Sequence, residues 1–444
     1  MSELELEIRK TLDNSKITLD ILRKVGRINK IDGQHEIFIE LLSHKSRDVR
    51  AEAVKNLGKF NEVSIIEKTL IEKFKSEEDS LVKRECVSSL GRQRNNTNIP
   101  FFISVLNDKD PKIVMQAIRA LLVFKNFPNV KAELHKIKNH PNEMIKEMLS
   151  IELSLEPDRS IDKHSHVNPL LKNVTVKGDV IEILKTITGE SFHLTFTSPP
   201  YYNARDYSFY SSYQEYLDFL RQVFKETHRL TKNGRFLIVN TSPVIVPRIS
   251  RSHSSKRYPI PFDIHCFLRQ DGWEFVDDIV WQKPEYCVKN RIGGFQQHRK
   301  PLAYKPNSVT EYLMVYRKKS NDLIDWNIKQ YDYDVVKNSK VKEGFETTNI
   351  WKLDPSFDKT HSAVFPKTLC ERVIKYYSMK GDLVFDPFGG SGTFGQVALE
   401  NERNYFLTEI DQIYFERIKE RLSFFNQEKK FLDFTEFKKT VERV

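Results

Sequence analysis

A glycine-rich turn between a short strand and a helix constrains the fold of this chain more than any other stretch. Residues 383–386 are apolar and predict a buried strand, Asp386-Pro-Phe-Gly-Gly-Ser-Gly-Thr393 forms the turn, and residues 396–400 predict a helix. Residues 404–411 then predict a second strand that ends in acids. Glycines let a ligand lie against the backbone, and the helix start offers free amides. This order predicts a Rossmann-like α/β unit.

Two details of this unit limit the class of ligand that it can bind. The turn lacks the Gly-Lys-Ser/Thr ending of a phosphate-binding loop, so a nucleoside triphosphate is not expected. A carboxylate about twenty residues beyond such a turn usually binds ribose hydroxyls, which makes Glu409 the ribose candidate.

A second stretch, Thr197-Ser-Pro-Pro-Tyr-Tyr-Asn203, follows a run that alternates as a strand does. It is therefore expected just beyond the carboxyl end of a strand, where open α/β sheets bind ligands. Two prolines stiffen the loop and leave carbonyls as acceptors. With the Ser198 hydroxyl and the Tyr201 ring, the loop suits a flat base that carries an exocyclic amine. Taken alone, it is also compatible with a proline-rich turn after a buried strand.

Together the two stretches resemble those of amino-group DNA methyltransferases that use S-adenosylmethionine. The resemblance covers about residues 170–425 and has the order of the beta group, with the catalytic loop ahead of the cofactor loop. It implies a mostly parallel α/β methyltransferase domain, S-adenosylmethionine as cofactor and double-stranded DNA as substrate. A third family segment, which ends at residues 361–367, is expected near the methionine part of the cofactor.

The resemblance assigns roles to individual residues. The implied catalytic residues are Ser198, Pro199, Pro200 and Tyr201. The implied cofactor-binding residues are Asp179, Thr197, Phe365, Pro366, Asp386, Pro387, Phe388, Gly389, Gly390, Ser391, Gly392, Thr393 and Glu409. For Asp179 a helix-capping role is an alternative that can coexist with cofactor binding.

The first residue of the catalytic loop bears on the target base. An acid there is typical of N6-adenine enzymes and a serine of N4-cytosine enzymes, so Ser198 favours cytosine N4. Adenine N6 remains an alternative, as does a protein that binds DNA or a partner and whose transferase fold is inert. Ring-carbon methylation needs an activated cysteine, which in such relatives follows a proline; none of the four cysteines here does. RNA is less favoured, because no stacking motif for single strands is visible.

Residues 1–155 predict helix after helix with an internal repeat. Val49, Ala53 and Leu57-Gly58 recur 33 residues later, from Val82 to Leu90-Gly91, and a third copy starts at Ile113. Such spacing predicts paired helices stacked as a solenoid, and the segment resembles HEAT repeats. Its basic side chains, Arg50, Lys55, Lys83, Arg84, Arg92 and Arg94, fit extra DNA contact or docking of a cognate nuclease or defence protein, or else a solvated helix face.

Segment boundaries follow from composition. Residues 156–169 are polar and break the helical period, so they predict a linker; its His164 and His166 have no acid or cysteine cluster nearby, and no metal site is expected. The methyltransferase domain is expected at 170–425 and a helical extension at 426–444.

Two basic segments are candidate DNA contacts. Residues 247–258 place cations among serines, which suits phosphates, and residues 284–347 are the expected target-recognition segment, since Arg and Gln read guanine and adenine edges. The candidate DNA-binding residues are Tyr202, Arg248, Arg251, Lys256, Arg257, Arg291, Gln296, Gln297 and Arg299. Tyr202 is, with Tyr201, a candidate to stack on an extruded base.

Overall composition agrees with a polyanionic partner. The chain of 444 residues carries a formal charge of +10 at pH 7. Widely spaced cysteines, no apolar run of membrane-spanning length and an acidic start predict a soluble, cytoplasmic protein without membrane contact. The resemblance implies a bacterial or archaeal, nucleoid-associated protein.

Overall fold

The computed structural model divides the chain into two compact units, Met1–Pro157 and Asp158–Val444. It describes residues 3–27, 35–60, 63–153, 164–202, 210–246, 252, 256–288, 301–302, 304, 306–320, 322–341, 347–356 and 365–443. The predicted linker 156–169 lies partly outside these residues, because residues 154–163 are not described.

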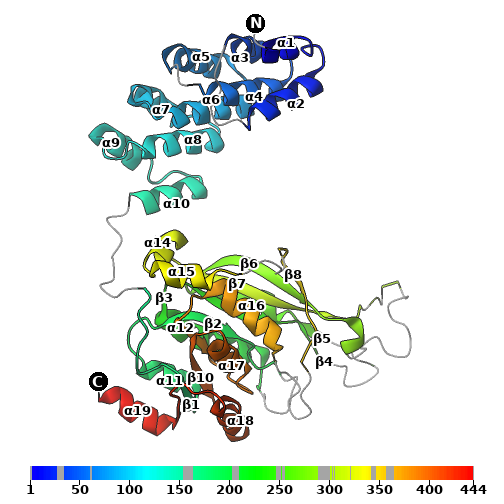
Figure 1. Cartoon of the computed structure of the whole chain (residues 1–444), viewed down its shortest axis with the longest axis vertical. Helices are drawn as coiled ribbons and strands as arrows, with labels where there is room; N and C mark the ends of the chain where they lie inside the picture. The colour runs from blue at the N-terminus through cyan, green and yellow to red at the C-terminus, as the bar shows by residue number, and fades with distance from the viewer. Residues whose placement is uncertain are drawn as a thin grey trace. The chain divides into compact units, whose positions relative to one another are not determined.

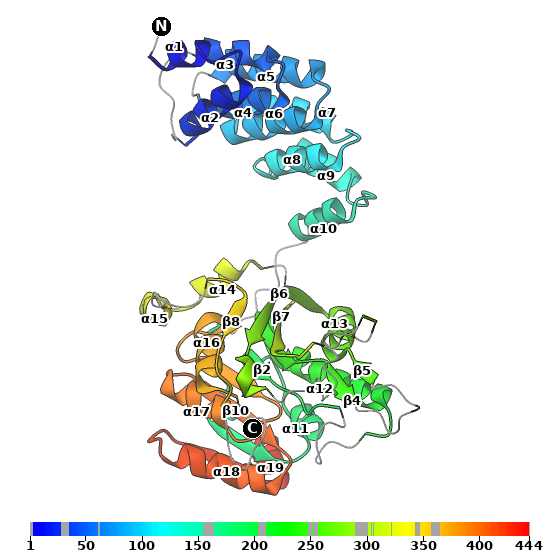
Figure 2. The same cartoon turned by 90° about the vertical axis from the view of Figure 1, so that its right-hand side faces the viewer.

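The first unit is a stack of helices (Figure 2). They are α1 (Glu3–Arg9), α2 (Ser15–Val25), α3 (Glu36–Glu40), α4 (Arg47–Leu57), α5 (Val63–Ser76), α6 (Ser80–Gln93), α7 (Ile99–Val105), α8 (Pro111–Leu122), α9 (Pro128–Lys136) and α10 (Glu143–Glu152), with 3-10 turns at Leu41–Ser43 and Asn96–Asn98. Helices α2, α4, α6, α8 and α10 pack successively against one another. The predicted all-α solenoid is confirmed, and the repeated motif forms α4, α6 and α8.

The repeated Leu-Gly has a packing reason. A Cβ on Gly58 would lie 2.7 Å from the Ser89 Cβ of the next repeat, and a Cβ on Gly91 would lie 3.0 Å from that of Ala120. The close approach also allows hydrogen bonds between repeats, since the buried Ser89 hydroxyl donates to the carbonyl of Val54 at 3.1 Å. Glycine at this position therefore lets neighbouring repeats share one core.

Several cations of the solenoid are engaged within it. Arg50 donates two hydrogen bonds to the Glu77 carboxylate, at 2.9 and 3.0 Å, and this pairing helps to lower the pKa of Glu77 to about 2 against the cost of its burial. Lys83 pairs with Asp108 at 3.4 Å, and Arg92 pairs with Glu85 at 3.0 Å. The interpretation of these three cations as DNA contacts is therefore not supported, because acids of the same unit already neutralise them.

The second unit is built on a mixed sheet (Figure 1). Among the described residues this sheet has nine strands in the order β11-β1-β10-β9-β2-β3-β7-β6-β8. The strands are β1 (Val174–Lys177), β2 (Phe192–Thr197), β3 (Thr231–Thr241), β6 (Trp273–Gln282), β7 (Thr310–Lys318), β8 (Ile350–Lys352), β9 (Leu383–Asp386), β10 (Asn404–Glu409) and β11 (Lys430–Asp433). Within this sheet β7 runs antiparallel to its neighbours, β3 and β6, and the other pairs are parallel. The predicted α/β fold with a mostly parallel sheet is confirmed.

Helices cover both faces of this sheet, as a mostly parallel sheet requires. Helices α16 (Lys367–Tyr377), α17 (Thr393–Glu400) and α18 (Gln412–Ser423) share a core with the strands on one face. Helices α11 (Val180–Thr186), α12 (Tyr213–Leu230), α13 (Ile260–Gln270) and α19 (Phe434–Glu442) pack on the other. Strands β2 and β9 are buried along their whole length.

Two predicted boundaries are wrong. The domain does not end at 425, because β11 pairs with β1 and the side chain of Phe437 in α19 is fully buried in its core. Nor do residues 284–347 form one recognition segment, because β7 is an inner strand of the sheet. Helices α14 (Ile324–Lys329) and α15 (Tyr333–Ser339) attach to the amino edge of the sheet, where Asn327 donates to the carbonyl of Asn233 at 3.2 Å.

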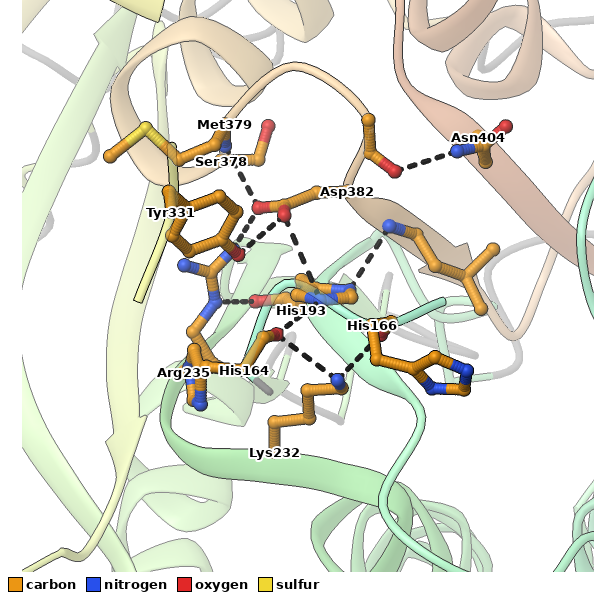
Figure 3. A network of polar contacts seen from close by, with 12 residues as sticks. His164, His166, His193, Lys232, Arg235, Tyr331, Ser378, Met379, Asp382 and Asn404 are labelled. Atoms are coloured by element: carbon orange, nitrogen blue, oxygen red, sulfur yellow. Dashed lines mark hydrogen bonds and ion pairs between the residues drawn. The ribbon is translucent and has the colours of Figure 1, made fainter. Parts of the chain in front are cut away.

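A buried polar network holds that amino edge together (Figure 3). Asp382, just before β9, pairs with Arg235 of β3 and accepts hydrogen bonds from the Tyr331 hydroxyl at 2.6 Å and the Met379 amide at 2.8 Å. Asp382 is 1% exposed, and the Arg235 charge keeps its carboxyl pKa below the usual value although burial opposes this. The network satisfies both charges, as buried ions require.

Histidine and lysine side chains extend the network to the segment that enters the unit. His193 of β2 accepts from the Leu383 amide at 3.1 Å, and its other ring nitrogen lies 2.9 Å from the carbonyl of His164. Lys232 donates to the carbonyls of His164 and His166, at 3.0 and 2.6 Å. Burial lowers the pKa of His193 to about 3, so its ring is neutral. The two linker histidines therefore have a structural role through their main chains.

Within the described ranges, no helix is both long and apolar enough to cross a bilayer.

Candidate active site

The two loops singled out in the sequence meet at the carboxyl edge of the sheet. Strands β2 and β9 are parallel neighbours, with Leu194 opposite Val384. At their ends the Thr197 hydroxyl donates a hydrogen bond of 2.7 Å to Oδ1 of Asp386. The predicted meeting of the catalytic loop and the glycine turn is therefore observed, and adjacent parallel strands are its cause.

A cavity of about 570 Å³ opens between these loops. Of the predicted residues it is lined by Asp179, Ser198, Pro199, Pro200, Tyr201, Phe365, Asp386, Pro387, Phe388, Gly389, Gly390, Ser391, Thr393 and Glu409. Thr197 is fully buried beneath it, while Pro366 and Gly392 precede α16 and α17 as their N-terminal caps. The cavity is within the size range of small-molecule sites.

Among the acids that line this cavity, Asp386 has the most strongly shifted pKa. Its side chain is 2% exposed and accepts hydrogen bonds from Thr197 and, at 3.0 Å, from the amide of Phe388. Burial raises its carboxyl pKa to about 8 despite these two donors, and the nearby Glu409 charge adds to the rise. Asp382, four residues earlier, is equally buried but has Arg235 as counter-ion. A buried acid that has no paired cation among the described residues and lies in a cavity marks a functional position.

Glu409 shapes the glycine turn. Its two carboxylate oxygens accept from the amide of Gly390 at 2.7 Å and the amide of Asp411 at 2.9 Å. Burial raises its pKa all the same. Gly389 lies so close to β10 that an added Cβ would be 3.2 Å from the Thr408 carbonyl oxygen, and Gly392 has a φ of +76° at the start of α17. The turn thus needs glycine at both positions.

Asp179 has the helix-capping role and lies where cofactor binding was predicted. Its carboxylate caps α11 by accepting from the amides of Ile181 at 2.9 Å and Glu182 at 3.1 Å, and the residue also lines the cavity. Phe365 forms an apolar wall and stacks on Phe196, with ring centroids 4.6 Å apart.

The two tyrosines of the catalytic loop differ in position. Tyr201 lines the cavity, whereas Tyr202 is 8% exposed and packs against Tyr213, Tyr216 and Tyr258 with centroids 4.9 to 5.6 Å apart. The prediction that Tyr202 contacts DNA is wrong, because its ring belongs to an aromatic core. Tyr201 remains the candidate for stacking.

Sequence reasoning missed the residues that hold Tyr201. Its hydroxyl donates to Oε2 of Glu311 at 3.2 Å, and Glu311 also accepts from Asn240 at 2.7 Å and pairs with Lys283. The pKa of Tyr201 lies well above its usual value, because the phenol is buried and faces this carboxylate. Glu311, Asn240 and Lys283 come from three different strands or strand ends and form no local motif.

The structure describes only some of the predicted DNA-binding residues. Lys256 and Arg257 are exposed on β5 (Lys256–Tyr258), which pairs with β4 (Val244–Val246) as a hairpin rather than forming a loop, and Lys256 lies 4.8 Å from the centre of the Tyr258 ring. The predicted contacts that lie outside the described residues are Arg248, Arg251, Arg291, Gln296, Gln297 and Arg299.

Comparison with known sequences identifies two families. The profile of the DNA methylase family matches residues 192–420, and that of HEAT repeats matches residues 35–121. The HEAT-like interpretation of the first unit is thereby confirmed.

Similar individual proteins are methyltransferases. The Type II beta methyltransferase M.BslI of Bacillus sp. (strain NEB-606) is 26% identical over 55% of this chain and 27% of its own length. The Type II methyltransferase M.Cfr9I of Citrobacter freundii is 26% identical over 59% of this chain and 92% of its own. This chain thus spans about a quarter of the first relative and most of the second.

Among solved structures, a putative DNA modification methylase from Thermus thermophilus, complexed with S-adenosyl-L-methionine, is similar with 25% identity and a TM-score of 0.48, covering 59% of this chain and 98% of that one. The family profile spans more than half of the chain and includes both loops of the cavity. The chain belongs to the DNA methylase family.

Proposed function

We propose that this chain transfers the methyl group of S-adenosylmethionine to the exocyclic N4 of cytosine in double-stranded DNA. The observation that carries the proposal is the shared cavity, in which the Ser198-Pro-Pro-Tyr201 loop and the glycine turn form adjacent walls. An amine-binding loop and a cofactor-binding turn on one cavity are what a direct transfer requires.

The residues present fit S-adenosylmethionine. Glycines leave room against the backbone, Phe365 and Phe388 offer apolar surface, and Asp386, Glu409 and Asp179 are acceptors for a cationic, hydroxyl-rich ligand. Glu409 would hold ribose hydroxyls and Asp386 would face positive charge. When bound, the cofactor supplies an electrophilic methyl group on a sulfonium.

The catalytic loop would prepare the nucleophile. The exocyclic amine of cytosine is a poor nucleophile, because its lone pair is delocalised into the ring. Hydrogen bonds from the amine to the Ser198 hydroxyl and the Pro199 carbonyl favour a more tetrahedral nitrogen and aim its lone pair. Tyr201 would stack on the base once it has left the duplex.

Ser198 supports cytosine N4 as the target. The alternative is methylation of adenine N6 by the same loop and cofactor site. Incubation with unmethylated DNA and S-adenosylmethionine, digestion to nucleosides and mass spectrometry separates the two. We expect N4-methylcytosine; N6-methyladenine instead would overturn the choice of base, and neither product would overturn the activity.

Variants separate an active enzyme from a DNA-binding protein with an inert transferase fold. Ser198→Ala is expected to abolish most methyl transfer while DNA binding and thermal stabilisation by S-adenosylmethionine persist. Ser211→Ala, an exposed serine just before α12, is the matched control and should leave the rate unchanged. No stabilisation of the wild type by the cofactor would favour the inert fold.

The names of M.BslI and M.Cfr9I support site-specific methylation within a restriction–modification system. Sequencing of modified bases in DNA from cells that express the chain would reveal the site. The solenoid would dock a cognate nuclease or defence protein; co-sedimentation of the purified chain with a nuclease encoded beside it tests this.

A further inference from the structure

Glu311 lies at the carboxyl edge of the sheet although it belongs to none of the predicted motifs. It is the second residue of β7, and because β7 runs antiparallel to β3, its start lies beside the end of β3, where Asn240 is opposite Leu313. The catalytic loop leaves β2, the strand next to β3, at this same edge. The Glu311 side chain is 15% exposed.

Three donors from three elements converge on this carboxylate. They are the Tyr201 hydroxyl at 3.2 Å from the catalytic loop, the Asn240 amide at 2.7 Å from β3 and the Lys283 ammonium, which follows β6. Lys283 also lies 4.3 Å from the centre of the Trp281 ring, which fixes its direction. Asn240 and Lys283 therefore hold the carboxylate on the rigid sheet, and Tyr201 is the contact that connects it to the catalytic loop.

The catalytic loop is thus tied at both ends. Thr197 is bonded to Asp386 at 2.7 Å, and four residues later Tyr201 is bonded to Glu311 at 3.2 Å. Between these anchors Pro199 and Pro200 fix their own φ angles. With both ends held, the backbone between them can adopt few conformations. The positions of the Ser198 hydroxyl and the Pro199 carbonyl are therefore restricted.

We propose that Glu311 is a positioning residue for methyl transfer, which holds the Tyr201 hydroxyl and thereby fixes the acceptors of the catalytic loop around the target amine. This inference rests on the proposed function. Glu311 touches neither base nor cofactor in this role; it acts through Tyr201.

A simpler role would be that of an ion pair with Lys283 that only stabilises the sheet. The two roles differ in their dependence on the Tyr201 hydroxyl. If Glu311 acts through Tyr201, removing either partner destroys the same geometry, so the two losses do not multiply. If Glu311 only stabilises the sheet, Tyr201→Phe and Glu311→Ala act independently.

The test compares single-turnover methylation rates at saturating cofactor and DNA for wild type, Glu311→Ala, Tyr201→Phe and the double variant; alanine is used because a glutamine oxygen could still accept from the Tyr201 hydroxyl. A displacement of reacting groups by about 1 Å costs about 100-fold in rate, so we expect losses of about 10- to 100-fold in each single variant. The double variant should be within about twofold of the slower single variant. Thermal stabilisation by S-adenosylmethionine checks that each variant is folded and should persist.

Glu274→Ala is the matched control, since it removes the same side chain from an exposed position on the neighbouring strand β6. It should keep the wild-type rate. A Glu311→Ala rate within about twofold of wild type, or a double variant whose loss is the product of the two single losses, overturns the inference while leaving the proposed function intact. A wild type that methylates no DNA overturns the proposed function and this inference with it.

Discussion

Asp386 is predicted to lose its proton when S-adenosylmethionine binds. The pKa of this buried carboxyl is about 8 in the free protein. At pH 7, roughly ten of every eleven molecules therefore carry the neutral acid. A positive charge brought within about 4–6 Å favours the carboxylate, and the cofactor carries a sulfonium and an ammonium. Binding at pH 7 should then release about 0.9 proton per molecule.

Calorimetric titration in two buffers of different ionisation enthalpy measures this release. The buffer takes up the released protons, so the observed binding enthalpy plotted against the buffer's ionisation enthalpy has a negative slope whose magnitude is the number of protons released. Asp386→Asn is the matched variant, since its amide oxygen can still accept from Thr197 but has no proton to lose. We expect a slope of about −0.9 for the wild type and near zero for the variant at pH 7. Lowering the pH to 6 should weaken wild-type binding about tenfold more than that of the variant, about 1.4 kcal/mol.

Equal slopes in the two proteins would refute the reasoning, because Asp386 would then keep its charge state on binding. Stability of the free protein gives an independent check. The carboxyl pKa rises from 3.8 in the unfolded chain to about 8 in the fold, so the native state binds the extra proton between these values and loses stability as pH rises through this window. Asp386→Asn should therefore gain stability relative to wild type as the pH is raised from about 4 to about 8 in urea denaturation.

Three further predictions concern stability. Asp382→Ala leaves the Arg235 charge buried and unpaired, so the free energy of unfolding in urea should fall by about 3–5 kcal/mol; a loss below about 1 kcal/mol would contradict the buried pair. Because the pKa of His193 falls from 6.5 to about 3 on folding, the unfolded chain binds the extra proton between these values, and stability should fall as pH drops below 6.5, by about 1.4 kcal/mol per unit; His193→Gln should give a shallower acid limb of the pH–stability curve. Gly58→Leu forces a side chain onto Ser89 and should cost about 1–3 kcal/mol, whereas an unchanged melting temperature would show that the repeats separate without cost.

The meeting of the two loops could be predicted from the sequence because it depends on local motifs. The loop at Ser198 and the turn at Gly389 each follow a short apolar strand, and parallel strands bring their carboxyl ends to one edge. The 33-residue offset of the solenoid was visible for a similar reason, since each repeat places its small residues at one contact.

What the sequence did not predict depends on contacts between distant segments. Tyr202 has the same sequence environment as Tyr201, yet only the packing of α12 and the β4–β5 hairpin decides that it is buried. β11 has four residues, too few for a recognisable alternation, and it pairs with a strand far away in the sequence, since Val174 is opposite Lys430. Glu311 was missed because its three partners are 28 to 110 residues away in sequence.

A buried aspartate lies at each end of β9: Asp382 just before the strand and Asp386 as its last residue. The first belongs to a structural network and the second lines the cavity. At the amino edge, Asp382 and its partners join β9, β2 and β3, the same strands that present Asp386, Ser198 and Asn240 at the other edge. A strand of four residues spans only about 13 Å. The Asp382 network and the cavity residues are therefore close in space, but they share no side chain. Exchange of Ser198 to alter base preference therefore leaves the Asp382 network unchanged and should cost little folding free energy, which makes this loop suitable for redesign of specificity.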